Sequence, residues 1–187
     1  MPPNVKYTKE QITQVAYEMV RKHGMEILTA RGLAAELGTS TAPIFTAFQS
    51  IEEVQTLVLE KAKQLYVCYL NAGLQLSPPF KGTGLKYIQF AKDEPELFKL
   101  LFMQGDENEE ITHFFPAADE NTATVLNTVK SSYSLNEEKA KKLYNHLSVY
   151  THGLAVLYAQ RRCVFTMEDI SLMLTEIFNA LTKGEIK

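Results

Sequence analysis

The sequence has few of the residues that mark secreted, fibrous or linker proteins. Two cysteines, Cys68 and Cys163, are too few for a disulfide framework, which points to a reducing compartment. Nine glycines and seven prolines among 187 residues are too sparse for collagen or low-complexity sequence. The start of the chain, MPPNVKYTKE, is polar and lacks the apolar stretch of a signal peptide. We therefore expect a globular cytoplasmic protein.

Catalytic motifs are also missing. The chain contains no Gly-x-Ser-x-Gly elbow, Gly-rich phosphate loop or dinucleotide fingerprint. Glu110 and His113 have the spacing of half a di-iron carboxylate site, but the second copy that such a site needs is absent, and a solvated acidic loop explains them better. Neither cysteine has a Cys or His partner at metal-ligand spacing. We expect no enzyme, no cofactor and no metal.

The chain also lacks alternating segments long enough for a sheet, and its apolar residues recur with helical spacing. Capping boxes at Thr8/Gln11 and Ser50/Glu53 predict helix starts, and Gly24 and Gly38 predict helix ends. The expected N-terminal helices span about 8–24, 29–37, 41–48 and 50–75. Two prolines and two glycines in SPPFKGTG (77–84) predict a break without helix or strand.

The C-terminal part continues the helical pattern. The expected elements are helices at about 84–92 and 95–103, loops at 106–110 and 116–119, a weaker helix at 119–132, and two long helices that begin at the capping boxes Ser134/Glu137 and Thr166/Asp169. Apolar residues on the two long helices alternate by three and four, as in helix bundles. The sequence therefore predicts an all-α protein of about nine helices.

Residues 143–160 contain no Asp, Glu, Lys or Arg over 18 positions, the length of a membrane span. Six polar residues, His146 and His152 among them, make the run too polar for a single span. A helix buried by the core and by a second subunit explains it better, with Leu154 as an expected interface residue. We expect a homodimer and no membrane insertion.

Charge is distributed unevenly around a net value of −3. Residues 1–50 hold five basic and four acidic side chains, whereas residues 51–187 hold 14 basic and 18 acidic ones. A basic N-terminal part on an acidic body has the sign expected of a DNA-reading head, although the asymmetry is small.

The segment 29–54, TARGLAAELGTSTAPIFTAFQSIEEV, predicts two short helices that meet at a tight turn around Gly38. Such a turn occurs in helix-turn-helix motifs, with Leu33 and Leu37 inward and short hydroxyls at Thr39, Ser40, Thr41 and Thr46 facing phosphates and base edges. An ordinary helical hairpin with capping and turn residues would show the same pattern.

Residues 8–54 resemble the DNA-binding head of the tetracycline-repressor (TetR/AcrR) family of transcriptional regulators. A first helix ending at Gly24, then TARGLAAELGTS, then PIFTAFQSIEEV follow the family order without a gap. The body segments 86–103 and 150–160 resemble a branch with a His-Gly pair, here His152-Gly153, where we interpret the glycine as a close helix approach and the histidine as structural.

The resemblance implies a domain at 1–50 that binds a palindromic operator in double-stranded DNA, and a domain at 51–187 that dimerises and binds a small-molecule effector. The DNA-contacting residues that we expect are Arg31, Thr39, Ser40, Thr41, Ala42, Pro43, Phe45 and Thr46, and the effector-contacting residues are Tyr69, Phe90, Phe98 and Phe102. We also expect Phe45 and Phe48 to be partly or wholly packed against the core of the head. This predicts a regulator, most simply a repressor released by its effector.

Three positions depart from the family pattern. Phe45 stands where Tyr is usual, Ala47 where His or Tyr is frequent, and Ile51 where Lys is usual. The resemblance therefore implies that three phosphate contacts are missing together, and we expect Arg31 and an N-terminal arm containing Lys6 and Lys9 to compensate. The alternative function is a helical homodimer that binds a small molecule or a protein and binds DNA weakly or not at all.

Overall fold

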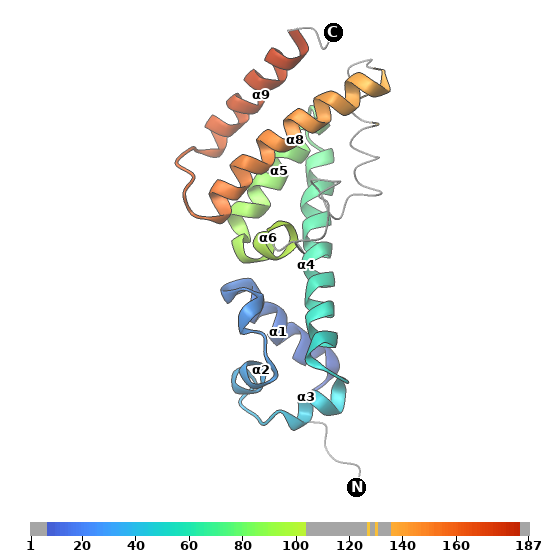
Figure 1. Ribbon diagram of the computed structural model, residues 1–187, viewed down its shortest axis with the longest axis vertical. Helices are drawn as coiled ribbons and strands as arrows, with labels where there is room; N and C mark the ends of the chain where they lie inside the picture. Colours follow the sequence, from blue (N-terminus) through green and yellow to red (C-terminus); the bar gives the residue numbers. More distant parts are fainter. Residues whose placement is uncertain (1–6, 104–126, 128–129, 131–135, 184–187) are drawn as a thin grey trace. The chain divides into compact units, whose positions relative to one another are not determined.

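The computed structural model describes residues 7–103, 127, 130 and 136–183, and all regular structure within these ranges is helical. The elements are α1 (Lys9–His23), the 3-10 turn η1 (Met25–Ile27), α2 (Ala30–Glu36), α3 (Ala42–Ala47), α4 (Ile51–Leu74), α5 (Pro79–Asp93), α6 (Pro95–Phe102), α8 (Glu137–Ala159) and α9 (Met167–Lys183) (Figure 1). The predicted all-α class is confirmed. None of these helices is long and apolar enough to cross a membrane.

Several predicted features lie outside the described residues. They are the two loops at 106–110 and 116–119, the weaker helix at 119–132 except for residues 127 and 130, which are helical, the capping residue Ser134, the arm residue Lys6 and the Glu110/His113 pair. The described residues form two compact units, one within Met1–Gln64 and Glu96–Gln104 and the other within Leu65–Pro95 and Gly105–Lys187. Helix α4 contributes its first residues to the first unit and its last to the second.

In the first unit, α1 begins and ends as its sequence predicts. The Thr8 hydroxyl accepts a hydrogen bond from the Gln11 N–H (3.2 Å), and the Gln11 side chain accepts one from the Thr8 N–H (2.9 Å). Gly24 ends the helix with a φ of +86°, a value that L side chains rarely adopt. The apolar stripe of α1, with Ile12, Ala16 and Val20 fully buried, belongs to the core of this unit.

The start of α4 differs from the predicted Ser50/Glu53 capping box. The Glu53 carboxylate accepts hydrogen bonds from the Gln49 N–H (2.8 Å) and from Nζ of Lys9 on α1 (2.6 Å). A cation from another helix thus helps to hold this carboxylate, so the residue caps α4 and fastens it to α1 at once. The Ser50 side chain interacts with Glu52 instead.

In the second unit, the break between helices is shorter than predicted, because α5 begins at Pro79 and residues 79–84 are helical. Proline is well suited to the first helical position, where its missing N–H leaves no hydrogen bond unmade. Gly82 packs against Gly73 of α4, so closely that a Cβ built on Gly73 would lie 2.7 Å from the Gly82 carbonyl oxygen. The glycines of this segment therefore allow a close helix crossing rather than a loop.

Helices α8 and α9 form an antiparallel hairpin that packs with α5 (Figure 1). Asn136, rather than Ser134, caps α8, since its side chain accepts a hydrogen bond from the Lys139 N–H (2.9 Å). At the start of α9 the predicted capping box is present: the Thr166 N–H donates to Asp169 (2.8 Å) and the Asp169 N–H donates to Thr166 (3.1 Å). The apolar side chains packed together here are Ala140, Leu143, Leu147, Phe80, Ile177, Phe178 and Leu181.

Candidate nucleic-acid interface

A tight turn with a left-handed glycine connects α2 to α3. Thr29 caps α2 by accepting a hydrogen bond from the Gly32 N–H (3.0 Å). At the other end, Gly38 has a φ of +62°, its N–H donates to the Ala35 carbonyl (3.0 Å), and the Thr39 N–H donates to the Ala34 carbonyl (2.9 Å). These two bonds form a Schellman motif, which fixes the direction in which the chain leaves α2.

The inward face of this helix pair is apolar and almost completely buried. Leu33 and Leu37 of α2 have exposed fractions of 0 % and 7 %, and Ile44 and Phe48 around α3 have 0 % and 2 %. The helix-turn-helix register expected from Gly38 therefore agrees with the packing. Because these four side chains anchor both helices in the core of the unit, the opposite face of α3 is held outward.

The eight residues expected to contact DNA lie on α2, on α3 or in the turn between them. The exposed ones are Arg31, Ser40, Ala42, Phe45 and Thr46, and the half-buried ones are Thr39, Thr41 and Pro43. Phe45 is only partly packed, since half of its surface is exposed, whereas Phe48 is buried. Phe45 follows buried Ile44 by one residue, and a rotation of about 100° per residue turns it away from the core.

Two polar groups of the head are already engaged within the chain. The Thr46 hydroxyl donates to the Ala42 carbonyl one turn earlier (2.9 Å), which uses its only proton. Lys9, expected in a free N-terminal arm, instead forms the first turn of α1, where it pairs with Glu53 and lies 4.9 Å from the centroid of the Phe48 ring. The positive charge of Lys9 therefore interacts with residues of the head.

The four aromatic residues expected to contact an effector separate into two pairs. Tyr69 and Phe90 belong to the second unit, with ring centroids 5.3 Å apart, and the Tyr69 hydroxyl donates to Asp93 (3.0 Å). Phe98 and Phe102 belong to the first unit, on α6, with centroids 5.0 Å apart. Phe90 and Phe98 are fully buried.

Sequence reasoning did not find a partly buried polar contact between α5 and α8. The Tyr87 hydroxyl lies 2.8 Å from Nδ1 of His152, and burial lowers the pKa of this histidine while raising that of Tyr87. The adjacent Gly153 does not mark a close helix approach within the chain, because a Cβ built there would meet no atom within 4 Å. The approach of α5 to α8 and α9 occurs at Gly84, where such a Cβ would touch Thr151 and Leu174.

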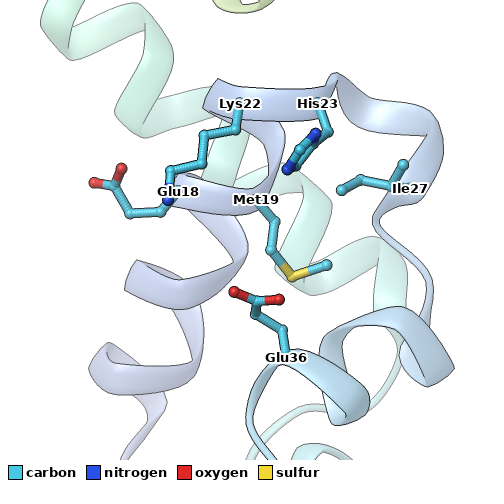
Figure 2. A pocket seen from close by; sticks show the side chains of 6 residues that line it. All are labelled: Glu18, Met19, Lys22, His23, Ile27 and Glu36. Atoms are coloured by element: carbon cyan, nitrogen blue, oxygen red, sulfur yellow. The ribbon is translucent and has the colours of Figure 1, made fainter.

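A small hollow in the first unit lies between α1, η1 and α2 (Figure 2). Its lining residues are Glu18, Met19, Lys22, His23, Ile27 and Glu36. Its volume of about 90 Å³ is well below the roughly 300 Å³ at which small-molecule sites begin, so it does not qualify as an effector cavity. In the described ranges, His, Cys, Asp and Glu side chains do not gather in threes as a metal site would require.

The fold is shared with a known regulator. The chain superimposes on the crystal structure of a TetR-like transcriptional regulator from Rhodococcus sp. RHA1 with a TM-score of 0.69 and 13 % sequence identity, over 95 % of this chain and 96 % of that one. No family model matches the sequence, and neither does any curated protein. The likeness therefore concerns the arrangement of helices along nearly the whole chain.

Proposed function

We propose that this protein is a cytoplasmic DNA-binding transcriptional regulator of the tetracycline-repressor type, in the branch with a His-Gly pair. Residues 1–50 form its DNA-reading domain, and residues 51–187 form its dimerisation and effector-binding domain. The observation that carries this proposal is the outward face of α3, which the buried side chains Ile44 and Phe48 hold away from the core behind a Schellman turn. The fold likeness along 95 % of the chain supports it.

In this function α3 enters the major groove, and α2 crosses the DNA backbone. The exposed hydroxyl of Ser40 and the guanidinium of Arg31 are the groups suited to phosphate oxygens, because they lie on the surface of the turn and of α2. Contacts of this kind fix the register of the protein on DNA, whereas the side chains of α3 read the bases.

Two copies of the chain bind a palindromic operator through α8 and α9. The outward side of α8 carries Val149, Gly153 and Leu157 at four-residue spacing, and 52 % and 37 % of the surfaces of Val149 and Leu157 are exposed. Leu172 of α9 is 65 % exposed. Gly153, with open space over its Cα, lets a second helix approach closely. A second copy would cover these apolar side chains and bring two heads to half-sites about one DNA turn apart.

Release by an effector follows from linkage between two sites. A small molecule that binds the body more tightly when the two heads are spaced wrongly for successive major grooves weakens DNA binding by the same factor. Tyr69 and Phe90, which pack together in the second unit, are the aromatic residues proposed to contact it, which favours an apolar or amphipathic molecule.

The test is unbiased selection of genomic DNA fragments with the purified protein. The proposal expects enrichment of fragments that share a palindromic sequence, whereas recovery at background levels would overturn it. The alternative function, a helical dimer that binds a small molecule or protein without DNA, is favoured by the replacement of three phosphate-contacting residues with Phe45, Ala47 and Ile51. A dimer in sedimentation equilibrium that enriches no fragment would support this alternative.

A further inference from the structure

The chemistry of the outward face of α3 is unusual for a surface that reads bases. The segment 38–50, GTSTAPIFTAFQS, contains no charged residue of either sign, and the six residues of α3 contain no amide side chain. Gln49, the one amide of the segment, lies beyond the C-cap Phe48, where its backbone N–H is bound by Glu53. This face therefore presents no side chain that could form two hydrogen bonds to one base, and no negative charge that would repel DNA.

What the face does present is apolar. Phe45 exposes half of its surface, Ala42 exposes a methyl group, and the Thr46 hydroxyl proton is bound to the Ala42 carbonyl (2.9 Å). With that proton occupied, Thr46 has no donor left for a base. Ile44 and Phe48 are buried, so a rotation of α3 that would exchange these faces would expose the core of the head.

Each base edge in the major groove has a preferred kind of side-chain partner. Guanine is read by Arg or Lys, adenine by Asn or Gln, and cytosine by an acceptor such as Glu or Asp, whereas the C5-methyl group of thymine is read by apolar contact. Ser and Thr hydroxyls bond to several bases and therefore select none of them strongly. α3 carries none of the first three kinds of side chain. Thymine is the base whose feature matches an exposed phenyl ring and neighbouring methyl groups.

We infer that Phe45 is the specificity-determining residue of this head, and that it recognises thymine C5-methyl groups in the major groove of each half-site. This inference rests on the proposed DNA-binding function and names the DNA chemistry that the function reads. Removing one buried methyl group costs about 0.8 kcal/mol, which corresponds to a loss in affinity of about fourfold for each contacted thymine.

The experiment uses the full-length protein and the site obtained by selection. Each thymine of a half-site is replaced in turn by uracil, which removes the methyl group and leaves base pairing intact. We expect a loss of about fourfold at one or two positions in each half-site and none elsewhere. Replacing a sensitive T·A pair by C·G should also weaken binding, and 5-methylcytosine at that position should recover most of the loss.

The variant Phe45→Ala connects the effect to this side chain. It should bind the thymine and uracil forms of a sensitive position equally, with an unchanged salt dependence, because an apolar contact releases no counterions. Ser40→Ala is the matched control: it should weaken binding to both forms alike and keep their ratio. Since Phe45 lies outside the buried core, both variants should unfold at the temperature of the parent protein.

The outcomes separate the two proposals. If selection recovers no DNA, the proposed function and this inference both fail. If a site is bound but uracil changes affinity at no position, the DNA-binding function stands and the reading of methyl groups is wrong. If uracil weakens binding but Phe45→Ala preserves the thymine-to-uracil ratio, another residue reads the methyl group and the assignment to Phe45 is wrong.

Discussion

The Tyr87 hydroxyl and Nδ1 of His152 lie 2.8 Å apart and join α5 to α8 inside the second unit. Burial lowers the pKa of His152 below the ordinary histidine value of about 6.5, so the folded state disfavours the charged imidazolium. This polar pair links the two helices and makes the stability of their packing depend on pH.

The first prediction concerns this pH dependence. Below about pH 6.5 the unfolded chain binds a proton at His152 before the folded chain does, so the free energy of unfolding should fall as the pH drops from 6.5 toward the lowered folded pKa. Urea unfolding of the protein and of His152→Asn at several pH values between 7.5 and 5 measures the difference. His152→Asn should lose this part of the acid sensitivity, whereas His23→Asn, at an exposed position of α1, should keep it. Equal slopes for all three proteins would contradict the prediction.

The second prediction compares two helix glycines with opposite surroundings. A Cβ at Gly73 would lie 2.7 Å from the Gly82 carbonyl and from the backbone of Thr83, so Gly73→Ala should destabilise the protein by about 1–3 kcal/mol. Gly153→Ala meets no atom within 4 Å and should raise the stability of the isolated chain by up to about 1 kcal/mol through helix propensity. Denaturant unfolding at a protein concentration where sedimentation shows monomer gives both values. A stable Gly73→Ala protein would show that the α4–α5 crossing is not as close as described.

The third prediction locates the dimer interface. Leu154, which periodicity alone places at the interface, is 6 % exposed and belongs to the core of its own chain, so charging it would test folding instead. Val149→Glu and Leu157→Glu charge exposed positions on the outward side of α8 and should shift sedimentation equilibrium at micromolar concentration from dimer to monomer. Thr56→Glu on the exposed side of α4 is the control and should remain dimeric. Charged variants that still dimerise would place the interface elsewhere.

The fourth prediction concerns the missing phosphate contacts. Ile51 is the first residue of α4 and is half-buried, and a lysine there should place a cation beside the DNA backbone. Ile51→Lys should tighten binding to selected and random DNA alike and steepen the salt dependence by about one counterion. Ile51→Leu should change neither. If the lysine leaves affinity unchanged at every salt concentration, the start of α4 does not meet DNA in the proposed way.

Local sequence signals predicted most helix ends well, because caps act over three or four residues. Thr8 with Gln11, Gly24, Gly38 and Thr166 with Asp169 all lie where their types indicated. The errors arose where a distant segment intervened. Lys9 of α1 donates a hydrogen bond to the Glu53 carboxylate, which the sequence predicted to form a capping box with Ser50. Gly82 belongs to a helix crossing with α4 rather than to a loop.

The candidate site was likewise predicted only in part from the sequence. The residues around Gly38 predicted the turn between α2 and α3. Helical spacing predicted that Leu33 and Leu37 are buried. Neither could show that Phe45 faces solvent, because an aromatic side chain on a short helix fits a core as well as a surface, and the choice depends on how Ile44 and Phe48 fill the interior.

The sequence by itself determined the all-helical class, the positions of most caps and the turn between α2 and α3, because hydrogen bonds within one or two helical turns decide them. The tertiary structure decided which aromatic residues are exposed, which pairs meet, and which glycine is a crossing point. Those outcomes depend on the close packing of side chains and backbone from segments far apart in the chain, such as Tyr87 with His152 and Gly73 with Gly82, and no local pattern encodes them.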